Sequence, residues 1–201
     1  QNREGDTELI KQKRGASMSL AVCGLFAALI AAGAFIKITI PMPLTDMHFT
    51  MQWFFVLLAG LLLSSNQAFM SVATYLIVGL IGIPVFASGG GPAYLLKPTF
   101  GFLLGFAFAA WVMGFLNERM HTMRALPMMI PATAGFVVYY GMGLIYFYMI
   151  ANFLLVNPIG WKEIFVVYCV GTMAPDYILC VLAVVVAGRL KPAISQMMMY
   201  S

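Results

Sequence analysis

Charged side chains are scarce in this chain of 201 residues. Only 9% of them are charged, against about a quarter in a typical soluble domain, while 62% are hydrophobic. A soluble helical protein would need helices with one polar face at a period near 3.6, and the long segments here are apolar on every face. We therefore predict an all-α integral membrane protein. Despite the net charge of +4, we predict no nucleic-acid partner, because the basic residues are scattered at segment ends and form no stripe.

Residues that carry enzyme or metal chemistry are also few. The three cysteines fall inside apolar runs without CxxC spacing, so we expect small buried hydrophobes and neither a metal site nor a disulfide. Asp176 is the one carboxylate in the interior of a predicted span, whereas an intramembrane aspartyl protease needs two. His48 and His121 are predicted on opposite faces of the membrane, away from any nucleophile in a span. The GxxxxGK[ST] pattern of ATPases is missing. We expect no enzyme and no cofactor.

Apolar runs are what the chain has in abundance. Six spans are predicted, and the second is short for a crossing of about 20 residues. No cleavage site follows the first run, which is therefore predicted to be a span and not a signal peptide. We expect a cytoplasmic tail at 1–17, one six-helix membrane domain at 18–191 and a second tail at 192–201. The six spans are predicted at 18–36, 51–63, 68–83, 99–116, 129–150 and 163–187.

The basic residues predict the orientation of these spans. Eight of the eleven lie in the amino-terminal tail, just after the sixth span and in the loops on the same side, which makes both termini cytoplasmic by the positive-inside rule. Two irregular segments then face outward. Residues 38–50, ITIPMPLTDMHFT, are β-branched and proline-containing and are predicted to be an extended connection, a candidate lid. His48 within it either lines an outer cavity or is simply solvated.

The second outward segment is the loop between the third and fourth predicted spans. Three consecutive glycines permit positive φ angles and close backbone approach, and three prolines stiffen the path between bends. Lys97, near its end, either snorkels to lipid headgroups or pairs with a ligand anion beside the next helix's amino terminus. The loop is therefore predicted to hold a ligand. Its glycines are Gly89, Gly90 and Gly91.

Asp176 is the most informative residue in the second half of the chain. A carboxylate inside a span costs roughly 2.5 to 3.5 kcal/mol on insertion scales and indicates a functional site. We predict it about 13 residues, or roughly 20 Å, into the sixth span, beside a kink, because Pro175 disfavours regular helix at Ala174. Either hydroxyls and backbone groups satisfy the carboxylate within the bundle, or it accepts hydrogen bonds from a neutral, donor-rich ligand.

Small residues recur at four-residue spacing in the first span. Ala27 pairs with Ala31, and Ala28 with Ala32. Such stripes let helices approach closely in lipid. The stripe is either a docking face for another membrane protein or an internal packing surface.

The run from Phe49 to Phe106 resembles the biotin-specific substrate-binding (S) component of energy-coupling-factor (ECF) vitamin transporters. The pieces YLIVGLIGIPVFASGGG, YLLKPT and GFLLGF occur in that order, and APDYILCVLAVVVAGRLKPAI is similar to the family's closing segment. The resemblance implies a six-helix fold in the bacterial plasma membrane and high-affinity biotin capture from outside. It also implies a transmembrane coupling protein and two cytoplasmic ATPases as partners, with the alanine stripe facing the coupling protein.

The chain departs from that family pattern at two places. Family members usually show PGD followed two residues later by a lysine, whereas here Asp176 is followed by Tyr177, Ile178 and Leu179. Glycines are usual where this chain has Lys97 and Phe100. Our hypothesis is that Lys97 recognises the biotin carboxylate and Asp176 the ureido N–H groups. Alternatives are an S component for another vitamin, a solitary biotin carrier, and a membrane scaffold or intramembrane enzyme. Further predicted ligand contacts are Phe86, Tyr94, Phe100 and Gln52 with the three glycines.

Overall fold

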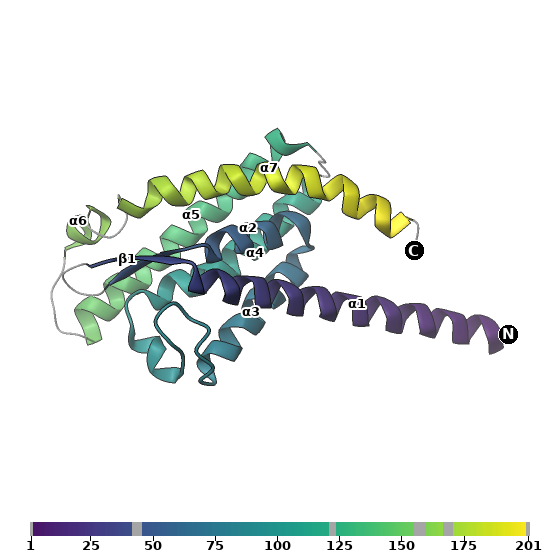
Figure 1. The fold of residues 1–201 in the computed structure, drawn as a ribbon, viewed down its shortest axis with the longest axis horizontal. Coiled ribbons are helices and arrows are strands. Elements are labelled where there is room, and N and C mark those ends of the chain that lie inside the picture. The colour runs from purple at the N-terminus through teal and green to yellow at the C-terminus, as the bar shows by residue number, and fades with distance from the viewer. Residues whose placement is uncertain (1, 42–45, 121–123, 155–159, 167–170, 200–201) are drawn as a thin grey trace.

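Long helices run roughly along one axis of the molecule, and a two-stranded hairpin lies at one end (Figure 1). The computed structural model describes residues 2–41, 46–120, 124–154, 160–166 and 171–199. In chain order the elements are α1 (Asn2–Phe35), β1 (Lys37–Ile40), β2 (Met47–Thr50), α2 (Gln52–Leu62), α3 (Ser65–Leu80), the 3-10 helix η1 (Pro92–Leu96), α4 (Phe100–Met120), α5 (Ala125–Met149), the π-helical turn η2 (Ile150–Leu154), α6 (Trp161–Ile164) and α7 (Gly171–Met199).

The helices confirm an all-helical, strongly apolar architecture. Among the described residues, four helical segments are long and apolar enough to cross a membrane: Gly15–Phe35, Phe100–Met120, Ala125–Leu154 and Thr172–Pro192. The second and third predicted spans correspond to shorter helices, α2 with 11 residues and α3 with 16. Six complete crossings therefore remain a prediction.

The two ends of the molecule differ in what they carry. The beginning of α1 and the end of α7 lie at the same end, while the hairpin and α6 lie at the other (Figure 1). Helix α1 continues through the predicted amino-terminal tail, and α7 continues to Met199 through most of the predicted carboxyl-terminal tail.

Helix α4 packs closely between α3 and α5, and glycines make the approach to α5 possible. A Cβ atom on Gly105 would lie only 2.8 Å from the Tyr139 carbonyl oxygen, and one on Gly143 would overlap the Phe102 ring. Because nothing larger than hydrogen fits at these positions, α4 and α5 hold Phe102 and Tyr139 against each other. Helix α2 is buried along most of its length and contacts α1, α4 and α7.

The extended connection predicted for residues 38–50 is confirmed where it is described. Strands β1 and β2 pair antiparallel, with Lys37 opposite Thr50 and Thr39 opposite His48. The β-branched side chains favour this pairing. Residues 42–45 lie outside the described part of the chain.

Asn117 follows the fourth predicted span, 99–116, and we expected it in the polar loop after that span, but it lies in α4 and is buried. Its amide Nδ2 donates to the Leu61 carbonyl oxygen at 2.7 Å, and Lys191 Nζ donates to its Oδ1 at 2.9 Å. The helix continues through this asparagine because its polar groups have partners inside the bundle.

The predicted start of the sixth span, Glu163, lies in a short helix before α7, and residues 167–170 between the two helices lie outside the described part of the chain, so this start remains a prediction. Residues Trp161–Ile164 form the short helix α6, and the described part of the last long helix begins at Gly171. Asp176 is therefore the sixth residue of α7, near its described beginning. Ala174 is helical, contrary to the prediction.

Candidate functional site

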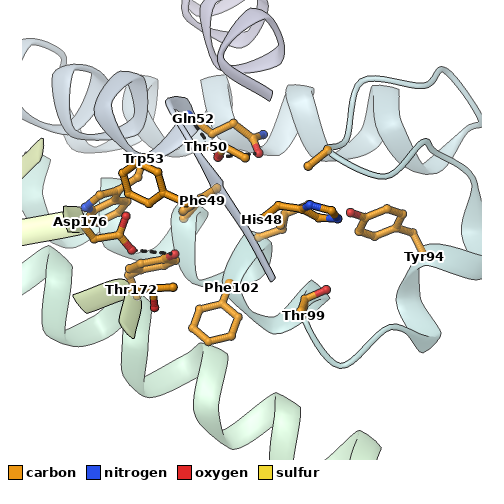
Figure 2. Close-up of a pocket in the computed structure, with 14 residues that line it drawn as sticks. His48, Phe49, Thr50, Gln52, Trp53, Tyr94, Thr99, Phe102, Thr172 and Asp176 are labelled. Carbon is orange, nitrogen blue, oxygen red and sulfur yellow. Dashed lines mark hydrogen bonds between the residues drawn. The ribbon is translucent and has the colours of Figure 1, made fainter. Parts of the chain in front are cut away.

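A cavity of about 50 Å³ lies where the hairpin meets the helices (Figure 2). Asp176, Trp53 and Thr172 form one end of it, and His48 and Tyr94 lie at the other. We call these the closed end and the mouth. The cavity is lined by His48, Phe49, Thr50, Gln52, Trp53, Ala87, Tyr94, Thr99, Phe102, Leu103, Phe106, Tyr139, Thr172 and Asp176.

The closed end is built around the carboxylate of Asp176, which is 4% exposed. Tyr140 donates to Asp176 Oδ2 at 2.6 Å, and Tyr139 donates to the same oxygen at 3.4 Å. The Tyr140 hydroxyl has one proton, so Thr172 Oγ1, 3.1 Å away, can donate its own proton to the phenol oxygen. Hydroxyls thus satisfy Asp176 within the bundle, and the residue also lines the cavity. A carboxylate satisfied within the bundle and a carboxylate that meets a ligand, the two alternatives from the sequence, are therefore compatible.

Stacked aromatic rings form the wall next to Asp176. Trp53, from α2, stacks on Tyr139 with ring centroids 4.4 Å apart and on Phe106 at 5.7 Å. Phe102 meets Tyr139 edge-on at 5.5 Å. The indole of Trp53 is 1% exposed. These rings present a flat apolar surface beside one carboxylate, the arrangement of a site for a ligand with an apolar body and a polar end.

Gln52 lines the cavity, but its amide already has partners. Nε2 donates to the Tyr75 hydroxyl, and the Thr50 hydroxyl donates to Oε1 at 3.2 Å. Tyr75 in turn donates to the Val85 carbonyl oxygen at 3.3 Å. This chain of hydrogen bonds connects the hairpin, α2, α3 and the loop after α3, so Gln52 positions those elements whether or not it also touches a ligand.

At the mouth, the hairpin and the glycine-rich loop are joined by side-chain hydrogen bonds. His48 Nε2 lies 2.5 Å from Ser88 Oγ, and Nδ1 lies 3.0 Å from Thr39 Oγ1. Lys37 Nζ donates to the Ala87 carbonyl oxygen. Burial, followed by the charges of Lys37 and Lys97, lowers the pKa of His48 against the opposing effect of Asp46.

The predicted ligand residues fall into two groups. Gln52, Tyr94 and Asp176 line the cavity together. Lys97 is outside the lining and has its Nζ 4.5 Å from the centroid of the Tyr94 ring, which places it behind a lining residue. Phe86, Phe100 and the three glycines are also outside the lining. Their roles in binding remain predictions.

The glycines shape the loop in two ways. Gly89 and Gly91 have positive φ angles of 110° and 100°, as the sequence predicted, and Gly89 exchanges two backbone hydrogen bonds with Phe86. A Cβ on Gly90 would overlap the Ile83 carbonyl oxygen. The close approach is therefore between two parts of the loop's own backbone. Phe86 packs on Gly79 of α3, in the core beside the site.

The alanine stripe of α1 faces two environments. Ala27 is buried at 8% exposure, and Ala31 packs against the same core. Ala28 and Ala32 are exposed. Internal packing accounts for Ala27 and Ala31 and does not account for Ala28 and Ala32. Docking of another membrane protein therefore remains a prediction for Ala28 and Ala32.

Sequence reasoning missed most of the closed end. Trp53, Phe102 and Phe106 were not separated from the many other aromatic residues, and Thr172 and Tyr139 were not considered. The adjacent Tyr139 and Tyr140 in the middle of an apolar run were the available signal, because buried phenols require hydrogen-bond partners.

Comparison with known proteins agrees with the resemblance seen in the sequence. A model of the family described as the BioY family matches residues 7–196. The chain belongs to the BioY family. It is 39% identical over 178 residues to the probable biotin transporter BioY of Lysinibacillus sphaericus, which covers 89% of both chains. It is 33% identical to the probable biotin transporter BioY of Pyrococcus horikoshii, over 86% of this chain and 95% of that one.

A solved structure supports the fold. The crystal structure of the S-component for biotin from an ECF-type ABC transporter superposes with a TM-score of 0.73, covering 89% of this chain and 93% of that one. At 23% identity this likeness establishes that the BioY family member described here has the S-component fold.

Proposed function

We propose that this BioY-family chain is the membrane subunit that captures biotin at the outer face and delivers it inward with an ECF energising module. The observation that carries the proposal is the match to proteins named biotin transporters over nearly the full length of both chains. The cavity supports it, because one end offers a carboxylate and the wall is aromatic.

Each part of biotin has a matching surface in the proposed complex. Both described phenol hydrogen bonds go to Asp176 Oδ2, and we place the ureido N–H groups at Oδ1. The bicyclic rings lie along Trp53, and the valeryl chain runs toward the mouth. Lys97 leaves the Tyr94 ring to meet the carboxylate. Because a cavity of about 50 Å³ holds only a few water molecules, biotin enters when the mouth side chains move apart.

We place the six spans across a bacterial plasma membrane, with the hairpin end outside. The shared end of α1 and α7 then faces the cytoplasm with the eight basic residues counted from the sequence. In this orientation the exposed alanines of α1 receive the transmembrane coupling protein, which connects the chain to two cytoplasmic ATPase subunits.

Calorimetric titration of the purified protein with biotin tests the ligand. We expect saturable 1:1 binding of biotin and at least 100-fold weaker binding of other water-soluble vitamins. Tight binding of a different vitamin would redirect the substrate assignment, and absence of any binding together with turnover of a lipid or peptide would overturn the proposal.

Co-purification tests the partners. Ala28→Leu and Ala32→Leu place bulk on the exposed stripe and should prevent isolation of a complex with the coupling protein while biotin still binds. Val181→Leu, at an exposed position on α7, is the control and should leave the complex intact. Biotin uptake by cells without the energising module would show instead a solitary carrier.

A further inference from the structure

We infer that His48 binds the anionic end of the ligand at the mouth and takes up a proton as it does so, which makes the protein select a carboxylate over the corresponding neutral amide. This inference rests on the proposed function and adds a residue and a selection rule to it.

The position of His48 is the first support. Its side chain lines the cavity at the end opposite Asp176, and its ring points toward Tyr94 (Figure 2). A ligand whose neutral head meets Asp176 would extend its other end toward this imidazole. His48 Nε2 lies 2.5 Å from Ser88 Oγ. The Ser88 hydroxyl can rotate and donate to the same ligand oxygen that the imidazole binds.

The charges around His48 are the second support. Lys37 from β1 and Lys97 after η1 both act on the imidazole, and Asp46 is the opposing carboxylate. The Lys97 ammonium lies over the ring face of Tyr94, the other ionisable mouth residue. Two ammonium groups thus act on the imidazole at the mouth, against one carboxylate. An entering anion is the group that complements this arrangement.

The proton balance follows from these surroundings. Without an anion, burial and the two lysines favour the neutral imidazole. A ligand carboxylate supplies the missing opposite charge, so the imidazole accepts a proton from solvent and Nε2–H donates a charge-assisted hydrogen bond. Affinity for the anion therefore rises as the pH falls from about 8 toward 6. A neutral amide gains nothing from the protonation.

Asp176 is the carboxylate in the cavity lining, and the choice of ligands separates its effect. Biotin and biotin amide share the ureido head that meets Asp176, and they differ only at the end that meets the mouth. The difference between the two ligands therefore reports on the mouth alone.

The test is calorimetry with biotin and biotin amide at pH 7.5, in two buffers of different ionisation enthalpy. For the wild-type protein we expect biotin to take up a measurable fraction of a proton and to bind about tenfold more tightly than the amide. The ratio of the affinity for biotin to that for biotin amide should be larger at pH 6. Binding of the amide should take up no proton beyond any that the ureido head causes at Asp176.

His48→Gln keeps a neutral hydrogen-bonding side chain and should reduce the biotin-to-amide ratio to about twofold or less, with loss of the proton uptake specific to biotin. Ser88→Ala should keep that uptake, since it leaves the imidazole in place. Equal affinities for both ligands in the wild type, or unchanged proton uptake in His48→Gln, would overturn the inference. Failure of the wild type to bind either ligand would instead refute the proposed function.

Discussion

The two ends of the cavity are built differently. At the closed end, Asp176, Tyr140 and Thr172 belong to α5 and α7, and their hydrogen bonds are buried. At the mouth, His48 is on a hairpin strand and Ser88 is in a loop, and the contact between them is exposed. Helices fix side-chain geometry through their packing, whereas contacts between a hairpin and a loop can open without disturbing the helices. The closed end is suited to recognising the ligand's head, and the mouth to admitting the ligand and reading its charge.

The largest effect is expected at the closed end. Asp176→Asn replaces the anionic acceptor by a neutral amide and should weaken biotin binding about 100-fold, because hydrogen bonds to a charged group contribute about 1.5 to 3 kcal/mol each. Biotin and its amide should lose affinity equally, since both share the head. A loss of only a few-fold, measured by titration, would place recognition elsewhere.

Lys97→Ala tests the mouth. Removing the ammonium should weaken biotin binding about tenfold and leave the affinity for biotin amide nearly unchanged. The matched control is Lys162→Ala, because Lys162 is an exposed lysine on α6. If the amide loses as much affinity as biotin, Lys97 supports the loop and does not meet the carboxylate.

Tyr140→Phe sharpens the account of the closed end. It removes the phenol that lies 2.6 Å from Asp176 Oδ2, whereas Tyr139→Phe removes one at 3.4 Å. By direct titration, we expect Tyr140→Phe to lose about fivefold in biotin affinity. Loss of the hydrogen bond in Tyr139→Phe should reduce the affinity less than twofold. Equal losses would show that the carboxylate does not depend on the shorter bond.

The smallest expected effect comes from the backbone of the mouth. A Cβ on Gly90 overlaps the Ile83 carbonyl oxygen, so Gly90→Ala should displace the loop and speed biotin dissociation about threefold, measured by ligand chase. Gly141→Ala on α5 meets no neighbour within 4 Å and is the control. An unchanged dissociation rate in Gly90→Ala would mean that the loop does not control exit.

Much of the helical framework could be predicted, because long apolar runs and polar turns are local properties. The turn at Ser64 is an example: it lies between the predicted spans 51–63 and 68–83, and the Ser64 side chain caps α3 together with Gln67. Pro175 did not prevent helix at Ala174. Asn117 was misjudged because the effect of an asparagine on a helix depends on its hydrogen-bond partners. Asn117 is satisfied by Leu61 and Lys191, which are distant in the sequence.

The candidate site was predictable to a smaller extent. Asp176 was identified because a carboxylate in an apolar run is costly, whatever surrounds it. His48 was left undecided, since its environment arises from Lys37, Lys97 and Ser88, which the hairpin and the loop bring together. The family and its implied ligand were recognised from ordered motifs, and the comparisons confirm the family.

By itself, the sequence determined that this is a helical membrane protein of the BioY family, with a conspicuous buried aspartate and a glycine-rich loop. Hydropathy and backbone chemistry act locally, so these features can be read along the chain. Only the tertiary structure decided that Asp176 is held by Tyr139 and Tyr140, that Trp53 forms the wall, and that His48 lies at the mouth. A cavity is a property of several elements packed together, and its lining depends on contacts between residues far apart in the chain.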